Sequence, residues 1–201
     1  MSNFETPEPL PFTDEEIFQQ YMENLDLRPE DFDKKILDVG SGSGQFAKWA
    51  KEHHVSDQIY SLEPSQEGEE KSKLVRGDAE VIPFQNESFD LVVSSAAIPQ
   101  IFSGPQYEGG REDKIRESLS ELVRVTRKGG EIRIGPLVEY SEDWQQEFKV
   151  AFNKVLDELK DRYHLAVEEK PLGEQGSKFD REGNVLEKEK IHLLKIYKPP
   201  K

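Results

Sequence analysis

Residues 36–44 read Ile-Leu-Asp-Val-Gly-Ser-Gly-Ser-Gly, and the rest of the chain is best interpreted outward from them. The first four residues are mostly apolar and predict a short buried strand. Gly40, Gly42 and Gly44 then form a turn in which no Cβ keeps a ligand away from the backbone. The next segment, 45–53, predicts a helix whose free N–H groups suit a carboxylate or a phosphate. A glycine-rich turn can also simply connect a strand to a helix.

Apolar runs alternate with helical patterns along the middle of the chain. Beyond the first strand and helix, the patterns predict strands at 58–62, 73–76, 89–94 and 131–134 and a helix at 114–126. Strands that alternate with helices favour parallel pairing. We therefore expect an α/β fold, a doubly wound, Rossmann-like and mostly parallel sheet with helices on both faces.

The two ends of the chain have a different character. We expect residues 1–12 to form an extended arm, and Thr13 followed by Glu16 predicts a capping box at the start of a helical cap over 13–32. A long amphipathic helix is predicted at 141–163. Its apolar stripe, from Trp144 to Tyr163, is spaced as the core face of a packed helix.

Two further strands are predicted at 165–167 and 191–197, and they suggest an antiparallel hairpin at the edge of the sheet. The segment between them contains Gly173, Gly176, Asp180 and Gly183 and is polar, so we expect a mobile loop there. Together these elements predict one domain over 13–201, with a core at 36–135 and a carboxyl-terminal helix and hairpin at 141–201.

The composition excludes several classes of function. The chain has 201 residues, which suits about one domain, and 27 Lys and Arg against 41 Asp and Glu give a formal charge of −14. This negative charge disfavours binding of nucleic acid or of an anionic membrane over a broad surface, because such binding depends on Lys and Arg. The absence of cysteine and the presence of only four histidines make a metal centre unexpected. No signal or spanning segment is evident, so we expect a cytoplasmic protein without a membrane partner.

Two acidic residues follow further predicted strands. Glu63 lies 19 residues after Gly44, about the spacing at which an acidic residue reaches a ribose diol in such folds. Asp78 follows the third predicted strand, where it could accept a hydrogen bond from an exocyclic amine. Either residue could instead be an ordinary exposed acid in a turn. Glu63, Asp78 and the glycine turn all lie at the carboxyl ends of predicted strands. Together they predict a nucleoside-binding site.

The glycine spacing separates the candidate nucleosides. The dinucleotide fingerprint is G-x-G-x-x-G, whereas Gly40, Gly42 and Gly44 give G-x-G-x-G, and residue 45 is glutamine. This spacing leaves a nicotinamide oxidoreductase as the weakest alternative. The turn also lacks the lysine of a P-loop, which excludes a nucleoside triphosphate hydrolase of that type.

Four blocks together resemble the class I S-adenosylmethionine-dependent methyltransferases, in particular their small single-domain type 11 group. The blocks are residues 36–44, 61–64, 77–95 and 119–135, in the family's order and over about half of the chain. Any one of them would be unspecific. Three features depart from the family pattern: Ser41 stands where a cysteine is frequent, no aromatic or histidine cluster follows Ser95, and the segment 63–73 is too short and too polar for the usual second helix.

The resemblance implies a role for each candidate site residue. The three glycines pass under the methionyl part of S-adenosylmethionine, Asp38 lies near its ammonium group, Glu63 takes the ribose hydroxyls and Asp78 the adenine amine. The remaining cofactor-binding residues are Ser41 and Pro64 beside these groups, Ala79 with a backbone contact to the ring, and Ser94 and Ser95 beneath the reacting methyl group.

The expected function is methyl transfer by in-line displacement, with S-adenosylhomocysteine as the product. The acceptor is expected to be a small molecule, with a protein as the second possibility and nucleic acid disfavoured. No general base is assigned, because His53, His54, His164 and His192 do not stand in an expected catalytic position. The alternative is a catalytically silent protein of this fold that binds the cofactor or a partner. The oligomeric state is open.

Three segments are expected to determine which acceptor is bound. They are the amino-terminal helix with Phe18, Tyr21 and Met22, the loop from Ile98 to Gly110, and the region around Tyr140 and Trp144. The loop has the glycines and aromatic residues of a lid, or is an ordinary surface connection.

Overall fold

The structure is a computed structural model, and it describes residues 12–65, 73–98, 102, 111–138, 143–179 and 184–200. In chain order the elements are α1 (Asp14–Asn24), the 3-10 helix η1 (Pro29–Asp33), β1 (Ile36–Val39), α2 (Gln45–Glu52), β2 (Ile59–Glu63), β3 (Leu74–Arg76), β4 (Phe89–Ser95), α3 (Arg111–Val125), β5 (Thr126–Val138), α4 (Asp143–Tyr163), β6 (Ala166–Phe179) and β7 (Val185–Tyr197).

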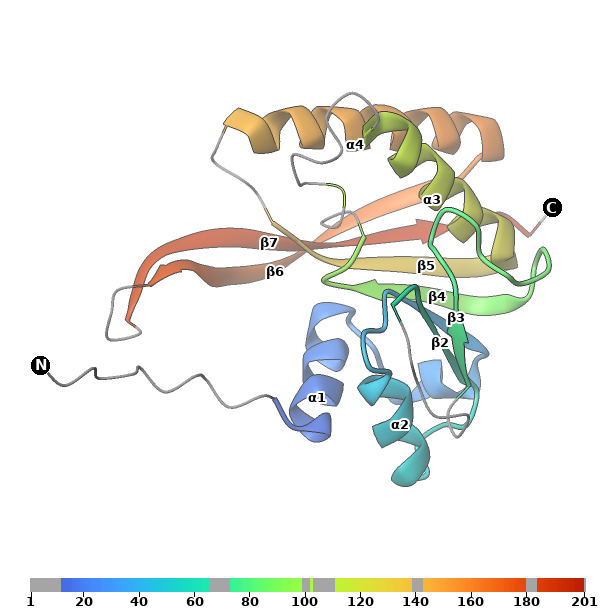
Figure 1. The fold of residues 1–201 in the computed structure, drawn as a ribbon. Coiled ribbons are helices and arrows are strands. Elements are labelled where there is room, and N and C mark those ends of the chain that lie inside the picture. The colour runs from blue at the N-terminus through green and yellow to red at the C-terminus, as the bar shows by residue number, and fades with distance from the viewer. Residues whose placement is uncertain are drawn as a thin grey trace, which may run out of the picture.

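The strands form a seven-stranded sheet in the order β3-β2-β1-β4-β5-β7-β6 (Figure 1). The first five strands in the chain pair in parallel, with β1 between β2 and β4. β7 runs antiparallel to β5, and β6 antiparallel to β7. The predicted fold class, a mostly parallel doubly wound sheet with an antiparallel carboxyl-terminal hairpin, is confirmed. The strand order reverses between β1 and β4, where open α/β sheets bind ligands.

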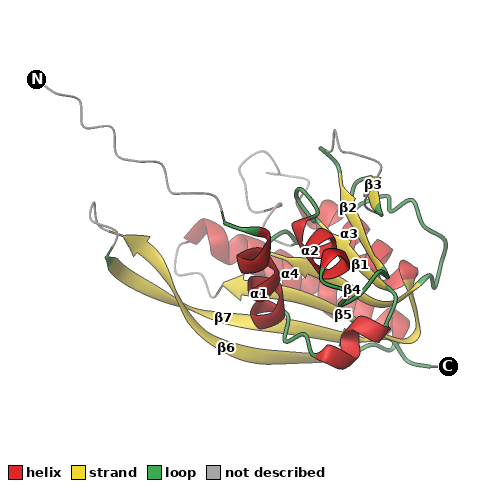
Figure 2. Ribbon diagram, turned by 90° about the horizontal axis from the view of Figure 1, so that it is seen from below, coloured by secondary structure: helices red, strands yellow, loops and turns green. Residues whose placement is uncertain are grey.

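Helices cover both faces of the sheet: α1 and α2 lie on one face, and α3 and α4 on the other (Figures 1 and 2). Along β1, side chains alternate between the faces. Ile36 packs in the apolar cluster beneath α1 and α2, whereas Leu37 and Val39 pack in the cluster on the α3 and α4 side. By the same alternation the side chain of Asp38 points toward α1 and α2.

The amino-terminal helix begins as predicted. The backbone N–H of Thr13 donates to Glu16 Oε2 at 2.8 Å, and the N–H of Glu16 donates to Thr13 Oγ1 at 3.2 Å, which completes the capping box. The apolar stripe of α1 is buried, with Phe18 and Tyr21 at 5% and 7% exposure. Their role as acceptor-recognising residues is therefore corrected, since both rings belong to the core.

The carboxyl-terminal hairpin is much longer than predicted. The expected mobile loop is wrong in its first part, because Gly173 and Gly176 lie within β6 and pair with Ile191 and Lys188 of β7. Asp180 and Gly183 lie outside the described residues. A two-stranded ribbon exposed on both sides needs no apolar face, so its sequence lacks the alternation that marks a strand.

The stripe of α4 lies in the core as expected where its side chains are described, with Phe148, Phe152, Val155 and Leu159 buried. Other expectations concern positions outside the described residues: the arm apart from Phe12, most of the loop from Ile98 to Gly110, Tyr140 and the side chain of Trp144. No helix in the described ranges has both the length and the apolar composition needed to cross a bilayer.

Candidate functional site

The glycine turn is tied to the neighbouring strand by its backbone. The N–H groups of Gly40 and Ser41 both donate to the carbonyl of Leu62 in β2, at 2.9 and 3.2 Å. Gly40, Gly42 and Gly44 have φ angles of +77°, +55° and +74°, a region that favours glycine. Gly44 is also the residue that precedes the first turn of α2.

The three glycines differ in what surrounds them. A Cβ on Gly40 would lie 2.3 Å from the Cβ of Ala97, so glycine is needed there for packing within the protein itself. A Cβ on Gly42 would meet no described atom within 4 Å, and one on Gly44 would lie 3.6 Å from Ser61 Oγ. The Cβ position of Gly42 therefore points away from the described atoms, as expected of a turn that approaches a ligand.

Glu63 ends β2 and reaches back to the turn. Its Oε2 accepts a hydrogen bond from the N–H of Gly42 at 3.1 Å, and its Oε1 accepts one from Ser65 Oγ at 2.8 Å. Oε1 also accepts a hydrogen bond from the backbone N–H of Ser65 at 3.4 Å, so the second lone pair of Oε2 is the one that these contacts leave available. The side chain is thus held beside the Gly42 turn with one acceptor position left for a ligand.

Asp38 is completely buried beneath α1 and α2. Its two carboxyl oxygens lie 3.2 and 3.1 Å from the hydroxyl of Tyr21. Burial raises the pKa of Asp38 to about 8, with a further increase from the charge of Glu63, although the hydrogen bond from Tyr21 lowers it. Perturbed carboxyl groups of this kind gather at functional sites.

The end of β4 contributes two serines. Ser94 is fully buried and its Oγ accepts a hydrogen bond from the N–H of Ile98 at 3.0 Å, so this hydroxyl fixes the chain as it leaves the strand. Ser95 pairs with Gly135 at the end of β5 and is half-buried. Of the two, Ser95 follows Val93 on the α1 and α2 face, the face toward which Asp38 points.

The segment after β3 lies next to Glu63, because Glu63 pairs with Arg76. Asp78 is exposed, and its carbonyl accepts a hydrogen bond from the N–H of Val81 at 3.1 Å. Ala79 packs partly against the core. The carbonyl of Pro64 accepts a hydrogen bond from Arg76 Nε at 3.2 Å, which joins the ends of β2 and β3.

All of the predicted site residues therefore belong to the carboxyl ends of β1 to β4 or the turns that follow, whereas the histidines do not gather there. His53 and His54 are exposed just beyond α2. His164 lies between α4 and β6, near the amino end of β5, and His192 pairs opposite Leu137 near the carboxyl end of β5. Among the described residues, no three histidine or acidic side chains are grouped as metal ligands.

The sequence reasoning missed two contacts: Tyr21, expected at the acceptor, instead bonds Asp38, and Ala97 packs on Gly40. The presence of one tyrosine on the otherwise apolar stripe of α1 was the available signal for Tyr21, since a buried hydroxyl requires a partner. Nothing local pointed to Ala97, which meets Gly40 from 57 positions away in the chain.

The geometry fits a nucleoside that carries a cationic group. Ser41 Oγ is buried and has no hydrogen-bond partner among the described residues, as expected of a group left for a ligand. The carboxylate of Glu63, the buried carboxyl of Asp38 and the space beside Gly42 that a Cβ would enter complete the set.

Solved structures share this fold. An S-adenosylmethionine-dependent methyltransferase from Archaeoglobus fulgidus aligns with a TM-score of 0.56 and 15% identity, over 92% of this chain and 95% of that one. One from Methanosarcina mazei aligns with a TM-score of 0.55 and 16% identity, over 92% and 98%. The fold is that of the class I methyltransferases.

Residues 37–134 match the family model described as a methyltransferase domain. They form a class I S-adenosylmethionine-dependent methyltransferase domain of the type 11 group, and S-adenosylmethionine is the cofactor of such domains.

Curated relatives align over part of their length. A malonyl-(acyl-carrier protein) O-methyltransferase of Erwinia pyrifoliae is 30% identical over 124 residues, 56% of this chain and 42% of that protein. A phthiotriol/phenolphthiotriol dimycocerosates methyltransferase of Mycobacterium leprae is 31% identical over 140 residues, 64% and 47% respectively. The chain thus spans less than half the length of these two relatives.

Proposed function

We propose that this chain is an active methyltransferase that uses S-adenosylmethionine to methylate a small-molecule acceptor. The observation that carries the proposal is the position of the Glu63 carboxylate, 3.1 Å from the N–H of Gly42 and beside the buried Asp38. These groups lie at the carboxyl edge where the strand order reverses. The name of the relative that methylates phthiotriol and phenolphthiotriol dimycocerosates supports a small-molecule acceptor, whereas the name of the malonyl-(acyl-carrier protein) relative points to an acyl group carried on a protein, the second possibility.

Binding and orientation are the main tasks of this chain's residues. The bound cofactor supplies a methyl group on a sulfonium, a good neutral leaving group. Glu63 accepts hydrogen bonds from the ribose hydroxyls, Asp78 receives the adenine amine, and Asp38 faces the ammonium group. Ala79 and Pro64 border the adenine and ribose, and Ser41 and the glycine turn border the methionyl part. Catalysis then consists largely of holding the acceptor in line with the methyl group, about 3–3.5 Å away.

The acceptor is proposed to lie between the end of β4 and the overhanging hairpin. β7 pairs with β5 as far as Ile191 opposite Val138, and β6 and β7 continue pairing beyond that point, up to Phe179 opposite Val185. The ribbon therefore extends past the carboxyl end of β5, as Figure 1 shows. This overhang and Ser95 border the same edge of the sheet. No general base is assigned, since one is required only for acceptors that must lose a proton.

Calorimetric titration with S-adenosylmethionine and S-adenosylhomocysteine, with NAD as the control ligand, tests the cofactor assignment. We expect binding of both sulfur ligands and none of NAD. Glu63→Ala should weaken binding by about 1–3 kcal/mol, the cost of leaving polar partners unpaired. Glu52→Ala is the matched control, an exposed glutamate at the far end of α2. Equal affinities for Glu63→Ala and the control would refute the assignment.

An acceptor screen then separates catalysis from silent binding. The readout is the acceptor-dependent formation of S-adenosylhomocysteine above the rate of background hydrolysis. Turnover with a small molecule supports the proposal. Tight cofactor binding without turnover on any small molecule or protein tested would instead favour the silent, cofactor-binding alternative.

A further inference from the structure

A buried carboxyl group beneath α1 has no cation to balance it. Asp38 is fully buried, and within the described part of the chain no lysine or arginine forms an ion pair with it. The charged group that affects it is Glu63, which is itself acidic. An ionised carboxylate in such a position is costly unless a cation arrives to pair with it.

Within the described ranges, the neutral donor that reaches this carboxyl group is Tyr21 of α1. Its hydroxyl lies 3.2 and 3.1 Å from the two oxygens of Asp38, and its ring stacks on Phe46 of α2, with centroids 4.3 Å apart and an angle of 12° between the planes. Burial and the charge of Asp38 raise the pKa of Tyr21 well above its usual value, so the phenol remains protonated and acts as the donor. The stacked ring fixes where that donor points.

Packing of α1 against the core does not by itself require a hydroxyl group at position 21. A phenylalanine at position 21 would fill the same space against Phe46 and Phe18, as the other rings of this cluster do. The hydroxyl adds a restraint on the one acidic side chain of β1, at the base of the glycine turn.

We propose that Tyr21 is a positioning residue for cofactor binding: its hydroxyl holds the Asp38 carboxylate in the orientation that receives the ammonium group of the methionyl moiety. This inference rests on the proposed function. It makes α1 a part of the cofactor site, because the packing of α1 on α2 decides where the Asp38 oxygens lie. The contribution should be specific to ligands that carry the ammonium group.

Two ligands that differ in this group test the proposal by calorimetry on the full chain. S-adenosylhomocysteine has the ammonium group, and 5′-methylthioadenosine shares the adenosine and thioether but lacks the amino acid moiety. Tyr21→Phe should weaken S-adenosylhomocysteine binding about tenfold, the usual scale for one hydrogen bond to a charged group, and leave methylthioadenosine binding unchanged. Tyr197→Phe is the matched control, since its exposed hydroxyl bonds Glu168 on the hairpin.

A double-mutant cycle provides the second measurement. If Tyr21 acts through Asp38, then Tyr21→Phe should change the affinity for S-adenosylhomocysteine less than twofold in an Asp38→Asn background. Equal losses for both ligands, an unchanged affinity for S-adenosylhomocysteine, or a full tenfold loss in the Asp38→Asn background would each overturn the proposal. If the wild-type chain bound neither ligand, the proposed function itself would fail. The two failures are therefore distinguishable.

Discussion

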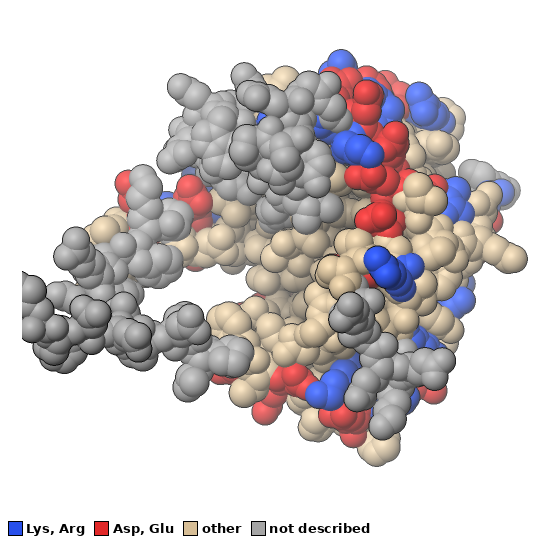
Figure 3. All heavy atoms as spheres, viewed as in Figure 1, with Lys and Arg blue, Asp and Glu red and all other residues tan. Residues whose placement is uncertain are grey.

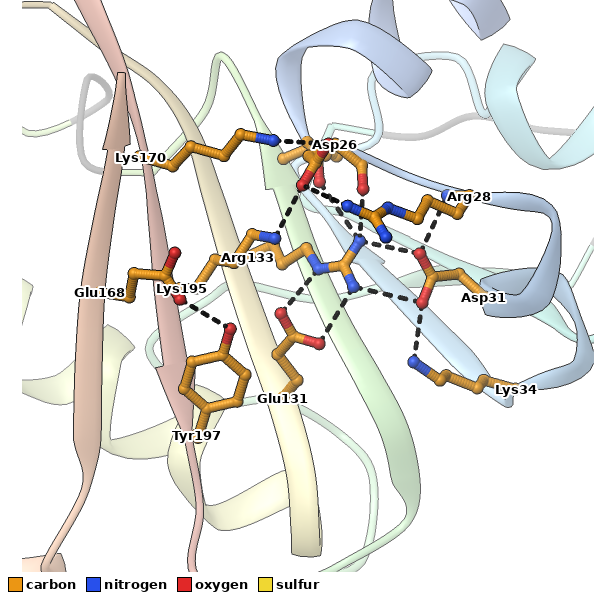
Figure 4. Close-up of polar contacts among 11 residues, drawn as sticks. Asp26, Arg28, Asp31, Lys34, Glu131, Arg133, Glu168, Lys170, Lys195 and Tyr197 are labelled. Atoms are coloured by element: carbon orange, nitrogen blue, oxygen red, sulfur yellow. Dashed lines mark hydrogen bonds and ion pairs between the residues drawn. The ribbon is translucent and has the colours of Figure 1, made fainter. Parts of the chain in front are cut away.

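The centre of the sheet and its carboxyl-terminal edge are held in place by different forces. At the centre, β1 and β4 are parallel and buried on both faces, and Ile36, Leu37, Leu91 and Val92 are all fully buried. At the edge, β5, β7 and β6 are antiparallel, and the side chains that join them to the amino-terminal cap are charged (Figure 4). Apolar burial stabilises the first region, whereas the second combines apolar side chains buried on β5 and β7, such as Ile134 and Leu193, with ion pairs to the amino-terminal cap.

Arg133 of β5 is the centre of this charged cluster. It is 6% exposed and donates to Asp31 of η1 at 2.8 and 3.2 Å and to Glu131 at 2.8 and 3.0 Å. Asp26, in the connection after α1, accepts from Lys170 and Lys195 of the hairpin, each at 2.8 Å. Burial alone would raise the pKa of Asp26, but these two lysines lower it to about 2.

This difference explains why one region is evident from local sequence and the other is not. Apolar burial leaves a periodic pattern in the chain, whereas an ion pair between residues 31 and 133 leaves none. Charged surface positions elsewhere are also paired, as with Arg127 and Asp90, and on the face in Figure 3 basic and acidic side chains lie side by side.

The largest expected effect comes from removing the centre of the charged cluster. Arg133→Met should lower the free energy of unfolding by about 3 kcal/mol, because it removes the buried partner shared by Asp31 and Glu131 and leaves Lys34 as the remaining cation paired with Asp31. Urea denaturation measures the loss. Lys170→Met is the control, with a side chain 39% exposed and an expected loss below about 1 kcal/mol. Equal losses of unfolding free energy for the two variants would contradict this prediction, because the buried Arg133–Asp31 pair would then contribute no more than an exposed pair.

Substitutions at two glycines of the same turn should affect different properties: stability at Gly40 and cofactor binding at Gly42. Gly40→Ala should lower the free energy of unfolding by about 2–4 kcal/mol, since its Cβ would lie 2.3 Å from Ala97 at a φ of +77°. Gly42→Val should abolish cofactor binding and cost only about 1–2 kcal/mol of stability, because its side chain enters open space at a φ of +55°. Thermal unfolding and calorimetry distinguish the two. Cofactor binding by a folded Gly42→Val protein would contradict the site assignment.

The protonation state of Asp38, in the central strand β1, provides a third test of the proposed cofactor site. With its pKa raised to about 8, Asp38 is mostly protonated at pH 7, flanked by Tyr21 of α1 and Glu63 of β2. Binding an ammonium group should ionise it and release about one proton, which calorimetry in buffers of different ionisation enthalpy measures. Affinity should therefore increase as the pH approaches 8. Asp38→Asn should release none; an equal release from this variant would assign the proton elsewhere.

The same residue also affects stability, with a definite sign. The pKa of Asp38 in the folded chain, about 8, lies above its ordinary value of 3.8, so the folded state binds more protons between these values. The stabilising contribution of this group is therefore complete below pH 3.8 and is lost as the pH rises through 8. Asp38→Asn should flatten the pH dependence of unfolding in this interval relative to the wild-type chain.

The smallest effect is expected at the tip of the hairpin. Leu186 is 64% exposed on β7, so Leu186→Ser should change the free energy of unfolding by less than about 0.5 kcal/mol and leave cofactor binding unchanged. If the overhang borders the acceptor, the KM for the acceptor should change while the affinity for S-adenosylhomocysteine does not. A loss of stability comparable to that of Arg133→Met would show that the tip, too, is held by packing.

Much of the part of the chain that forms the candidate cofactor site could be predicted, because the sequence patterns that indicate its elements are local. The capping box of α1, the strands β1, β2 and β4, and the turn at 40–44 each depend on residues adjacent in the chain. Their alternation with helices then predicted the parallel sheet, and the resemblance of four sequence blocks indicated the family. The roles assigned to Asp78, Ala79, Ser94 and the other cofactor-binding residues stay predictions until binding is measured.

The sequence by itself determined where the parallel strands β1 to β4 and the glycine turn lie, since backbone conformation and apolar periodicity are properties of neighbouring residues. Only the tertiary structure decided that Tyr21 meets Asp38, that Ala97 requires glycine at position 40, and that the hairpin runs past the end of β5. Each of these depends on atoms brought together by the packing of whole elements. Contacts of that kind depend on three-dimensional distance, which a pattern of adjacent residues does not record.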